Sequence, residues 1–354
     1  MISREVIQNL LEESVQAPSG ENAQPWRFGV RENQIHVWNI PERDHSPYNF
    51  RQRASYVANG AMIENLSIIS GAKGYDANVA LFPDKSDPHL VAIVTLTPTK
   101  PKDESLYPYI AGRVTNRKPY NEVPLAEHEK QALLGTANHA KGIEIFLTEK
   151  REDIVHLANV GSMNERVVFE NKFLHDFLFS HINWTKEENE AKKIGFDIKT
   201  LELPPPARMG FNIFKHWSAV KVFNKIGLSK MIRKQNGAQY AAAAAVAVIT
   251  FSGTEDMDFV EAGRVIERFW LTATKLGLAL QPMAGIIYFM QRILAGTPEP
   301  FSEHGVGLIT EAYETICRIF NVREKTIPMM FRIGHADPPS ARSLKLPPII
   351  VDLK

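Results

Sequence analysis

Apolar residues recur at helical spacing in some segments of the chain and form short continuous runs in others. Residues 3–16 have an apolar residue at every third or fourth position behind Ser3, a pattern that predicts an opening helix with a serine N-cap. Alternation over 26–30 and 34–38 predicts a pair of strands, and the run 90–96 has the length of a buried strand. A helix over 54–73 is expected between them.

Residues 97–103 (TPTKPKD) interrupt this pattern with two prolines and three charged residues. A segment with so little to bury predicts a domain boundary near residue 100, which divides the chain into 1–100 and 101–354. The second part carries patterns for helices near 105–112, 126–137, 152–180, 256–276 and 310–320, and for strands over 143–148, 246–251 and 328–333. Helices and strands in both parts predict an α+β protein.

Two of the expected helices resemble each other. Residues 58–66 (ANGAMIENL) and 261–269 (EAGRVIERF) both have an early glycine and a glutamate four positions later, and in both a glycine ends the helix. Each helix also neighbours a buried strand. The similarity indicates either a duplicated α+β unit within one chain or a chance likeness of two amphipathic helices.

The composition is that of an ordinary globular protein. The 354 residues include 41 Lys and Arg and 40 Asp and Glu, so the net charge of +1 disfavours a generally basic nucleic-acid-binding protein and an acidic disordered chain. The single cysteine, Cys317, excludes an intramolecular disulfide and a zinc site built on several thiolates. His175 and His181 are six positions apart rather than four, so no metal site is predicted.

The apolar segments are short. Charged and polar residues are spread through the first twenty positions, so the uninterrupted apolar core of a signal peptide is not predicted there. The longest apolar run, 241–249, has nine residues, against the roughly 20 that span a bilayer. We expect a soluble, cytoplasmic protein.

The most distinctive string is APSGENAQPW at 17–26. A helix end followed by these turn formers exposes backbone N–H groups and short polar side chains, which suit the flat polar edge of a ligand. The string resembles the signature loop of the nitroreductase-like flavoproteins, in which the loop hydrogen-bonds the pyrimidine side of the FMN ring. The resemblance implies that residues of this loop bind the cofactor, namely Pro18, Ser19, Gly20, Asn22 and Gln24.

A second string, RVTNR at 113–117, places two guanidinium groups on either side of a hydroxyl, a compact set of donors for a phosphate dianion. It resembles the R-R-S-x-R phosphate motif of the same family, with Val114 in place of the second arginine. The resemblance assigns Arg113, Thr115 and Arg117 to the phosphate. An ordinary solvated arginine pair is the alternative.

Two further segments resemble parts of the same family. The turn QPMAG at 281–285 resembles the P-x-E-G turn whose backbone N–H groups face flavin N5 and O4. Ala284 stands where many members have glutamate, so only a backbone role is implied for the turn residues Pro282, Met283, Ala284 and Gly285. The tail 342–347 (RSLKLP) resembles the closing basic segment, which implies a phosphate role for Arg342 and Lys345; surface charges are the alternative.

The order of these motifs is inverted relative to a typical family member, whose phosphate motif precedes the P-S-G-x-N loop. Family members are entwined homodimers that share FMN, so the inversion implies a nitroreductase-like fold that is internally duplicated, one chain mimicking the homodimer with one FMN. The first half, 1–100, would carry the loop and the second, 101–354, the phosphate motif. The similarity is greatest to the Acg-type NAD(P)H nitroreductase branch, through VANGAMIENLSI, IAGRVTNR and GLALQPM.

This resemblance implies an FMN-dependent oxidoreductase that transfers electrons from NAD(P)H to a small-molecule acceptor, a nitroaromatic or a quinone. The flavin N5 carries such chemistry, so no catalytic side chain is predicted. Neither a Rossmann nor a P-loop glycine motif is present. The alternative is a flavin-binding or flavin-sequestering protein with a lidded site and little turnover.

An insert around 185–240 is least like the family. Within it, 207–235 is basic, lacks Asp and Glu, and has apolar residues at helical spacing. Such a segment favours a lid or a packed helix, and a helix lying on an anionic membrane surface is the less favoured alternative. The sequence leaves these alternatives open, and it leaves open whether the protein is a monomer or a homodimer.

Overall fold

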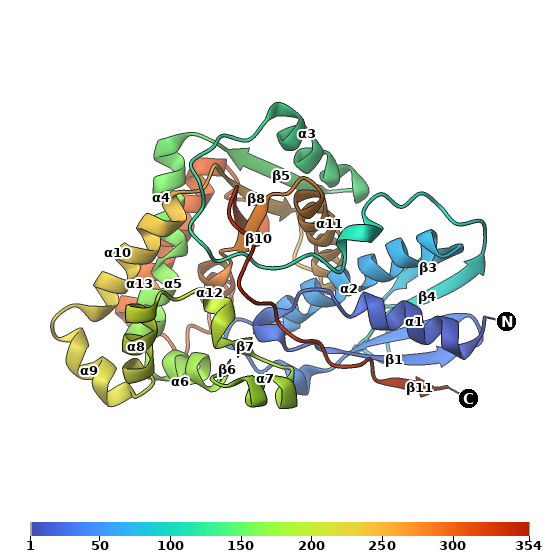
Figure 1. The fold of residues 1–354 in the computed structure, drawn as a ribbon, viewed down its shortest axis with the longest axis horizontal. Coiled ribbons are helices and arrows are strands. Elements are labelled where there is room, and N and C mark those ends of the chain that lie inside the picture. Colours follow the sequence, from blue (N-terminus) through green and yellow to red (C-terminus); the bar gives the residue numbers. More distant parts are fainter. Residues whose placement is uncertain (1, 354) are drawn as a thin grey trace.

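The computed structural model describes residues 2–353, and within them two larger sheets are flanked by helices (Figure 1). The first sheet has the order β11-β1-β2-β4-β3, and only the β1–β11 pair is parallel. The predicted strands at 26–30, 34–38 and 90–96 are present, and β3 and β11 were not predicted. The strands of this sheet are β1 (Trp26–Arg31), β2 (Gln34–Asn39), β3 (Tyr75–Leu81), β4 (Leu90–Pro98) and β11 (Ile350–Asp352).

The second sheet is antiparallel throughout, with the order β5-β8-β10-β9. All seven residues of β8 are buried, which explains why this strand reads as a continuous apolar run. The three predicted strands are present, and the short β9 precedes the turn expected at 281–285. The strands are β5 (Ile143–Thr148), β8 (Ala245–Phe251), β9 (Ala279–Pro282) and β10 (Thr326–Gly334).

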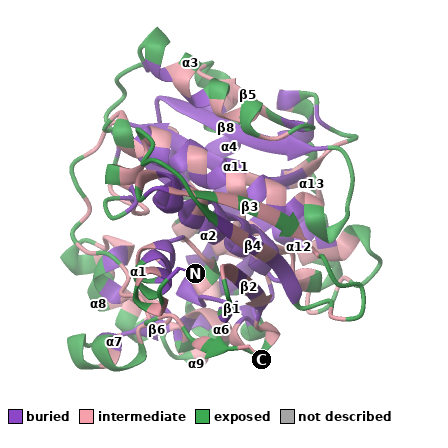
Figure 2. Ribbon diagram, turned by 90° about the vertical axis from the view of Figure 1, so that its right-hand side faces the viewer, coloured by how far each residue is buried: buried purple, intermediate pink, exposed green. Residues whose placement is uncertain are grey.

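Two long helices, α2 (Arg53–Ala72) and α11 (Asp256–Lys275), pack against each other in the middle of the molecule (Figures 1 and 2). They cross at Gly60 and Gly263. A Cβ on Gly60 would lie 2.0 Å from the carbonyl oxygen of Val260, and one on Gly263 would lie 2.1 Å from that of Val57. The reciprocal contact explains why both similar segments have glycine at this position, and it agrees with the predicted internal duplication.

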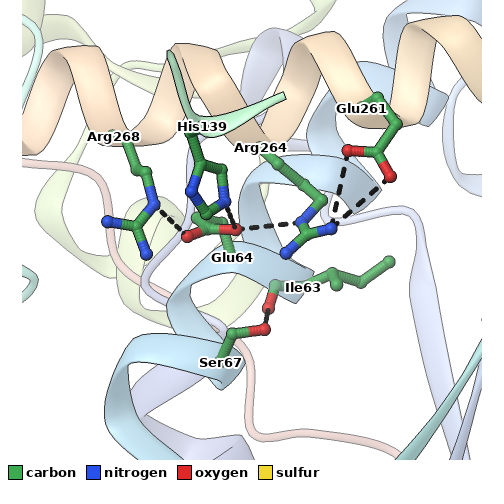
Figure 3. Close-up of polar contacts among 7 residues, drawn as sticks. All are labelled: Ile63, Glu64, Ser67, His139, Glu261, Arg264 and Arg268. Carbon is green, nitrogen blue, oxygen red and sulfur yellow. Dashed lines mark hydrogen bonds and ion pairs between the residues drawn. The ribbon is translucent and has the colours of Figure 1, made fainter. Parts of the chain in front are cut away.

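The glutamates of the two similar segments are both fully buried and both lie beside arginine. Arg264 Nε donates to Glu64 Oε2 over 2.9 Å, His139 Nε2 lies 3.1 Å from the same oxygen, and Arg268 pairs with Glu64 Oε1 (Figure 3). Burial raises the pKa of Glu64, but the hydrogen bond from His139 and the charges of Arg268 and Arg264 outweigh it and lower the pKa to about 2. Glu267, the counterpart on α11, lies beside Arg113.

Two of the predicted helices are wrong. The stretch 152–180 is not continuous but forms α4 (Arg151–Gly161), α5 (Met163–Glu170) and α6 (Lys172–Ser180). The last break comes at Asn171, whose side chain accepts the N–H of Leu174 and so caps a new helix. The segment 105–112 has only a 3₁₀ turn at Tyr107–Tyr109.

Several of the remaining helices were predicted. The opening helix and the one at 126–137 are confirmed with small shifts at their ends, and the helix at 310–320 is confirmed but begins earlier, at Glu303. The helices are α1 (Arg4–Ser14), α3 (Glu127–Gly135), α7 (Lys186–Lys192), α8 (Pro205–Phe214), α9 (Trp217–Asn224), α10 (Leu228–Ala241), α12 (Gly285–Leu294) and α13 (Glu303–Phe320); β6 (Ile182–Asn183) and β7 (Phe196–Asp197) form a short parallel pair. None of the helices described between residues 2 and 353 is long and apolar enough to cross a membrane.

The C-terminal tail leaves the second sheet and returns to the first. After β10 it runs to β11, which pairs with β1 in the register Phe28 with Ile350. A division into 1–100 and 101–354 stays a prediction, and the first sheet takes its edge strand from the end of the second part.

Candidate functional site

A cavity of about 390 Å³ lies where the two parts of the chain meet. This volume is within the range of small-molecule sites. All the predicted site residues except Gln24 and Met283 line it, so segments near residues 20, 115, 283 and 343 converge on one space. The sheet topology brings them together, because the tail lies beside the P-S-G-E-N loop on its way to β11.

The P-S-G-E-N loop is held in an uncommon backbone conformation. Glu21, Asn22 and Gln24 have φ values of 44°, 55° and 53°, a region that non-glycine residues occupy at a cost in energy. Asn22 Nδ2 donates to the carbonyl oxygens of Lys193 (2.9 Å) and Leu344 (2.8 Å). The loop is therefore fastened to two distant segments.

Gln24 has a different task from the one predicted. Its side chain donates to the carbonyl of Lys193 over 2.8 Å and accepts the N–H of Leu346 over 2.8 Å. Gln24 is fully buried, and both polar atoms of its side-chain amide are used in these two hydrogen bonds. Gln24 therefore holds the tail in place behind the cavity wall.

Three cations converge at one end of the cavity. Arg113 is buried, donates to the carbonyl of Gln16 over 2.9 Å and stacks 4.6 Å from the centre of the Trp270 ring. Lys345 Nζ donates to Ala17 O over 2.7 Å and to Asn22 Oδ1 over 2.9 Å. Arg342 donates to the carbonyl of Ala111.

The end of the cavity formed by Arg113, Arg342 and Lys345, here called the basic end, has more cationic than anionic side chains. Burial and the charges of Arg113 and Arg342 lower the pKa of Lys345 from 10.5 to about 7. Glu267 is the carboxylate nearest to Arg113, at 3.2 Å from its Nε, and burial raises the pKa of Glu267 to about 7. Arg113 Nε and both Glu267 oxygens have no hydrogen-bond partner among the described residues. The donors of Arg113, Arg342 and Lys345, rather than the Glu267 carboxyl, suit an anion that accepts several hydrogen bonds.

Arg117 points toward a different part of the cavity. It donates to the carbonyl of Thr200 over 3.1 Å, and its guanidinium lies 5.3 Å from the centre of the Phe196 ring. Thr115 lines the wall beside it. Arg117 therefore connects the phosphate-like motif to the residues that cover the cavity.

The cover comes from residues near 178 and from 196–201. Phe177, Leu178, Phe196 and Leu201 line the cavity, and the N–H of Gly195 donates to Glu21 O over 2.9 Å. No residue of 205–241 reaches the cavity wall. The lid considered for 207–235 is thus formed by an earlier part of the insert.

The Q-P-M-A-G turn joins β9 to α12. Pro282, Ala284 and Gly285 line the cavity, and a Cβ on Gly285 would lie 2.2 Å from Asn164 Oδ1. The N–H of Met283 donates to Met330 O over 2.8 Å, so Met283 belongs to the sheet rather than to the wall.

The far end of the cavity is acidic, and sequence reasoning missed it. Burial and the neighbouring Asp44 raise the pKa of Glu21 to about 8, and burial also raises the pKa values of Asp44 and Glu165. Tyr48 donates to Asn164 Oδ1 over 3.0 Å at the same end. Nothing in the spacing of these residues indicated a site, because they come from separate loops and helices.

Residues 2–353 contain no group of three or more His, Cys, Asp or Glu side chains placed to hold a metal ion. His175, one of the two histidines considered above, is fully buried and hydrogen-bonds Phe214 O over 2.8 Å.

Comparison with known proteins gives matches of low identity, and no family model matches. An uncharacterized protein of Mycobacterium tuberculosis (strain CDC 1551 / Oshkosh) is 24% identical over 335 residues, which cover 93% of this chain and 46% of that protein. The "Putative NAD(P)H nitroreductase acg" of M. tuberculosis (strain H37Rv) is 27% identical over 185 residues, 51% of this chain and 54% of that protein. The chain spans about half the length of these curated relatives.

The fold is α+β, as predicted, and the named matches are nitroreductases, the class that the sequence resembles. Within it, the chain resembles the Acg-type proteins. Solved structures with partial likeness include a nitroreductase with bound FMN from Desulfitobacterium hafniense (12% identity, 67% of this chain and 93% of that chain, TM-score 0.36). Another is the FMN-dependent nitroreductase NfnB of Mycobacterium smegmatis in complex with NADPH (14%, 66% and 88%, TM-score 0.35).

Proposed function

We propose that this chain binds one FMN in the cavity and is an FMN-dependent oxidoreductase that passes electrons from NAD(P)H to a nitroaromatic or quinone-type acceptor. The observation that carries the proposal is the convergence of four family-like segments on one space. These segments are far apart in the sequence, and a chance resemblance of each would not bring them to a common wall.

The basic end fits the phosphate of FMN. Arg113 is a buried guanidinium group, and the half-buried amine of Lys345 has its pKa lowered by burial and by the charges of Arg113 and Arg342. A phosphate dianion would supply acceptors to both and offset the repulsion between the cations. Thr115 would contribute a hydroxyl from the same wall.

The P-S-G-E-N loop and the Q-P-M-A-G turn would hold the ring. Ser19, Gly20 and Asn22 line the wall on one side and Ala284 and Gly285 on another. Their loops are rigid because Asn22 is bonded to two segments and Gly285 packs closely on Asn164. Bound FMN would supply hydride and electron transfer, and these residues would bind and orient it without taking part in the chemistry.

The residues of the cover would exclude water from the ring, since Phe177, Phe196 and Leu201 present apolar surface to the cavity. Glu21 would hold a proton at neutral pH, given its pKa of about 8. No side chain is proposed as a catalytic acid or base.

The test is anaerobic reduction of the flavin-loaded protein. The purified chain should take up FMN, and NADH or NADPH should bleach the bound flavin, with a nitroaromatic or quinone restoring the colour. The variant Arg113→Met should lose FMN uptake, whereas Lys141→Met, which changes an exposed lysine, should not. A protein that takes up no FMN would refute the proposal.

One observation favours a second candidate, a flavin-sequestering protein. The cover is fastened across the cavity by the bonds of Arg117 to Thr200 and of Gly195 to Glu21, and a permanently closed cover would keep out the electron donor. Reduction by dithionite but by neither NADH nor NADPH would select this candidate. We further propose a cytoplasmic location for either one, as the sequence with its single cysteine suggests.

A further inference from the structure

The outer surface of α8, α9 and the start of α10 is unusually apolar. Figures 1 and 2 place α8 and α9 at the periphery of the molecule. Six large apolar side chains of this segment are exposed, whereas the apolar residues of the hydrophobic core beneath it are buried. The exposed fractions are 74% for Met209, 56% for Ile213, 62% for Val222, 40% for Phe223, 82% for Ile226 and 60% for Met231.

These residues are additional to the apolar face that anchors the segment. Phe211, Phe214 and Trp217 pack against the second hydrophobic core, and Val220 and Leu228 are buried in it. A surface helix of a globular protein has one apolar face toward the core and a polar face toward water. Here the outward face is also apolar, so folding of the chain does not account for it.

The outward apolar residues lie on the helices and in the turn between them, and the segment is held in place by its neighbours. Met209 and Ile213 are four positions apart and lie on one side of α8. Val222 belongs to α9, and Ile226 lies in the turn between α9 and α10. The ring of Phe223 lies 5.5 Å from that of Phe214 and joins α9 to α8. Two side chains fasten the segment to α5, because Asn224 Nδ2 donates to Phe169 O over 2.6 Å and Ser229 Oγ donates to Glu170 Oε1 over 2.7 Å.

The charge of the segment is of one sign. Residues 203–254 contain no Asp or Glu. The nearest carboxylates of the neighbouring helices are already paired, Asp176 with Lys172 and Glu170 with Arg166. Exposed cations lie on the same helices as the apolar residues or directly after them, namely Arg208, Lys215, Lys221, Lys225, Lys230 and Lys234.

We propose that residues 208–234 bind the surface of an anionic lipid bilayer. The side chains of Met209, Ile213, Val222 and Ile226 would enter the interfacial region, and the lysines around them would contact the acidic headgroups. Exposed apolar side chains within a ring of cations are what an interfacial lipid site requires. Acidic headgroups, presented at high density in a plane, match both the cations and the apolar side chains, so an anionic bilayer is the occupant we propose. This proposal does not depend on FMN binding.

The experiment is co-sedimentation of the full-length protein with vesicles. With vesicles of phosphatidylcholine and phosphatidylglycerol at low salt, the protein should pellet, and it should be released at about 0.5 M salt because the lysine contribution is screened. Vesicles of phosphatidylcholine alone should bind it much less. The double variant Lys221→Glu, Lys225→Glu should reduce the partition coefficient at least about 25-fold, since each basic residue contributes about fivefold.

A second double variant, Val222→Ser, Ile226→Ser, should reduce binding about tenfold or more through the loss of inserted apolar surface. The matched controls are Leu294→Ser, a residue 67% exposed on α12, and Lys141→Glu, an exposed loop lysine; both should bind as the original protein does. Circular dichroism and thermal unfolding show whether each variant is folded.

Absence of pelleting with anionic vesicles at low salt would refute the proposal, as would binding that the two double variants leave unchanged. Size-exclusion chromatography covers the other occupant of such a surface. If the protein is a dimer that the Val222→Ser, Ile226→Ser variant dissociates, and vesicles do not bind it, then the surface is a contact between two copies and the lipid proposal is wrong.

Discussion

The affinity for FMN should fall steeply as the pH rises above 7.5, and Lys345 should be the cause. In the protein without ligand, burial and two neighbouring guanidinium groups lower the pKa of Lys345 from 10.5 to about 7. A phosphate dianion beside the ammonium group raises that pKa again. Binding therefore takes up one proton at any pH between the two values.

The magnitude follows from linkage. The free protein has lost the proton of Lys345 above pH 7, whereas the complex keeps it up to its own pKa, so the dissociation constant rises about tenfold for each pH unit between them. If FMN returns Lys345 to its ordinary pKa, the constant rises about 100-fold between pH 7.5 and 9.5. The phosphate of FMN does not confuse this window, because the second pKa of a phosphomonoester is about 6.

The assay is titration of the apoprotein with FMN, followed by flavin fluorescence, at several pH values and constant ionic strength. Lys345→Met should bind FMN weakly at pH 7.5 and show no further loss at pH 9.5. Lys345→Arg keeps its charge over the whole range, so its dissociation constant should stay level. A dissociation constant of the original protein that changes less than about twofold over this range, or a Lys345→Arg variant that keeps the steep dependence, would show that Lys345 does not contact the phosphate.

Three other substitutions test the fold and the cover. Gly60→Ala places a Cβ 2.0 Å from a carbonyl oxygen of α11 and should lower the free energy of unfolding, measured in urea, by about 3 kcal/mol or more. Gly307→Ala, whose Cβ would have no atom within 4 Å, should stabilise α13 by about 0.5 to 1 kcal/mol. Equal effects of the two substitutions would contradict the close crossing of α2 and α11. The pKa of Glu64 is lowered from 4.5 to about 2, so the ionised carboxylate stabilises the fold by about 3 kcal/mol above pH 4.5, and this stabilisation is lost as the pH falls through 2. Glu64→Gln should lack this part of the pH dependence when the free energy of unfolding is measured from pH 5 to 2. The same pH dependence in the variant and the original protein would refute the assignment. Arg117→Met removes the hydrogen bond to the carbonyl of Thr200 in the cover. It should speed FMN release about tenfold in stopped-flow measurements, because one charged hydrogen bond contributes about 1.5 kcal/mol or more. An unchanged release rate would mean that the cover does not retain the ligand.

Much of the site could be predicted from short strings. The P-S-G-E-N loop, the R-V-T-N-R string and the basic tail each consist of residues whose chemistry suggests a ligand, and the structure places them on one cavity. A ligand-binding role can be predicted from a short string when the residues of that string supply the binding groups themselves. Gln24 and Met283 also belong to such strings, but neighbouring strands and the tail use their hydrogen-bonding groups, and no string contains that information.

Other features could not be read from local pattern. The acidic end of the cavity combines Glu21, Asp44 and Glu165 from three separate segments, and their raised pKa values result from shared burial rather than from spacing. The three-helix arrangement over 151–180 also escaped prediction. Its apolar residues continue across the breaks, and only the capping side chain of Asn171 marks one of them.

The sequence by itself determined several of the helices and strands, the motif strings and the similarity of the segments that carry Gly60 and Gly263. Periodicity, capping and turn preferences act over a few neighbouring residues, so they are visible without a fold. Only the tertiary structure decided which strings meet. The ammonium group of Lys345 reaches the carbonyl of Ala17 from 328 positions away, and it does so because the tail must run beside the loop to add β11 to the first sheet.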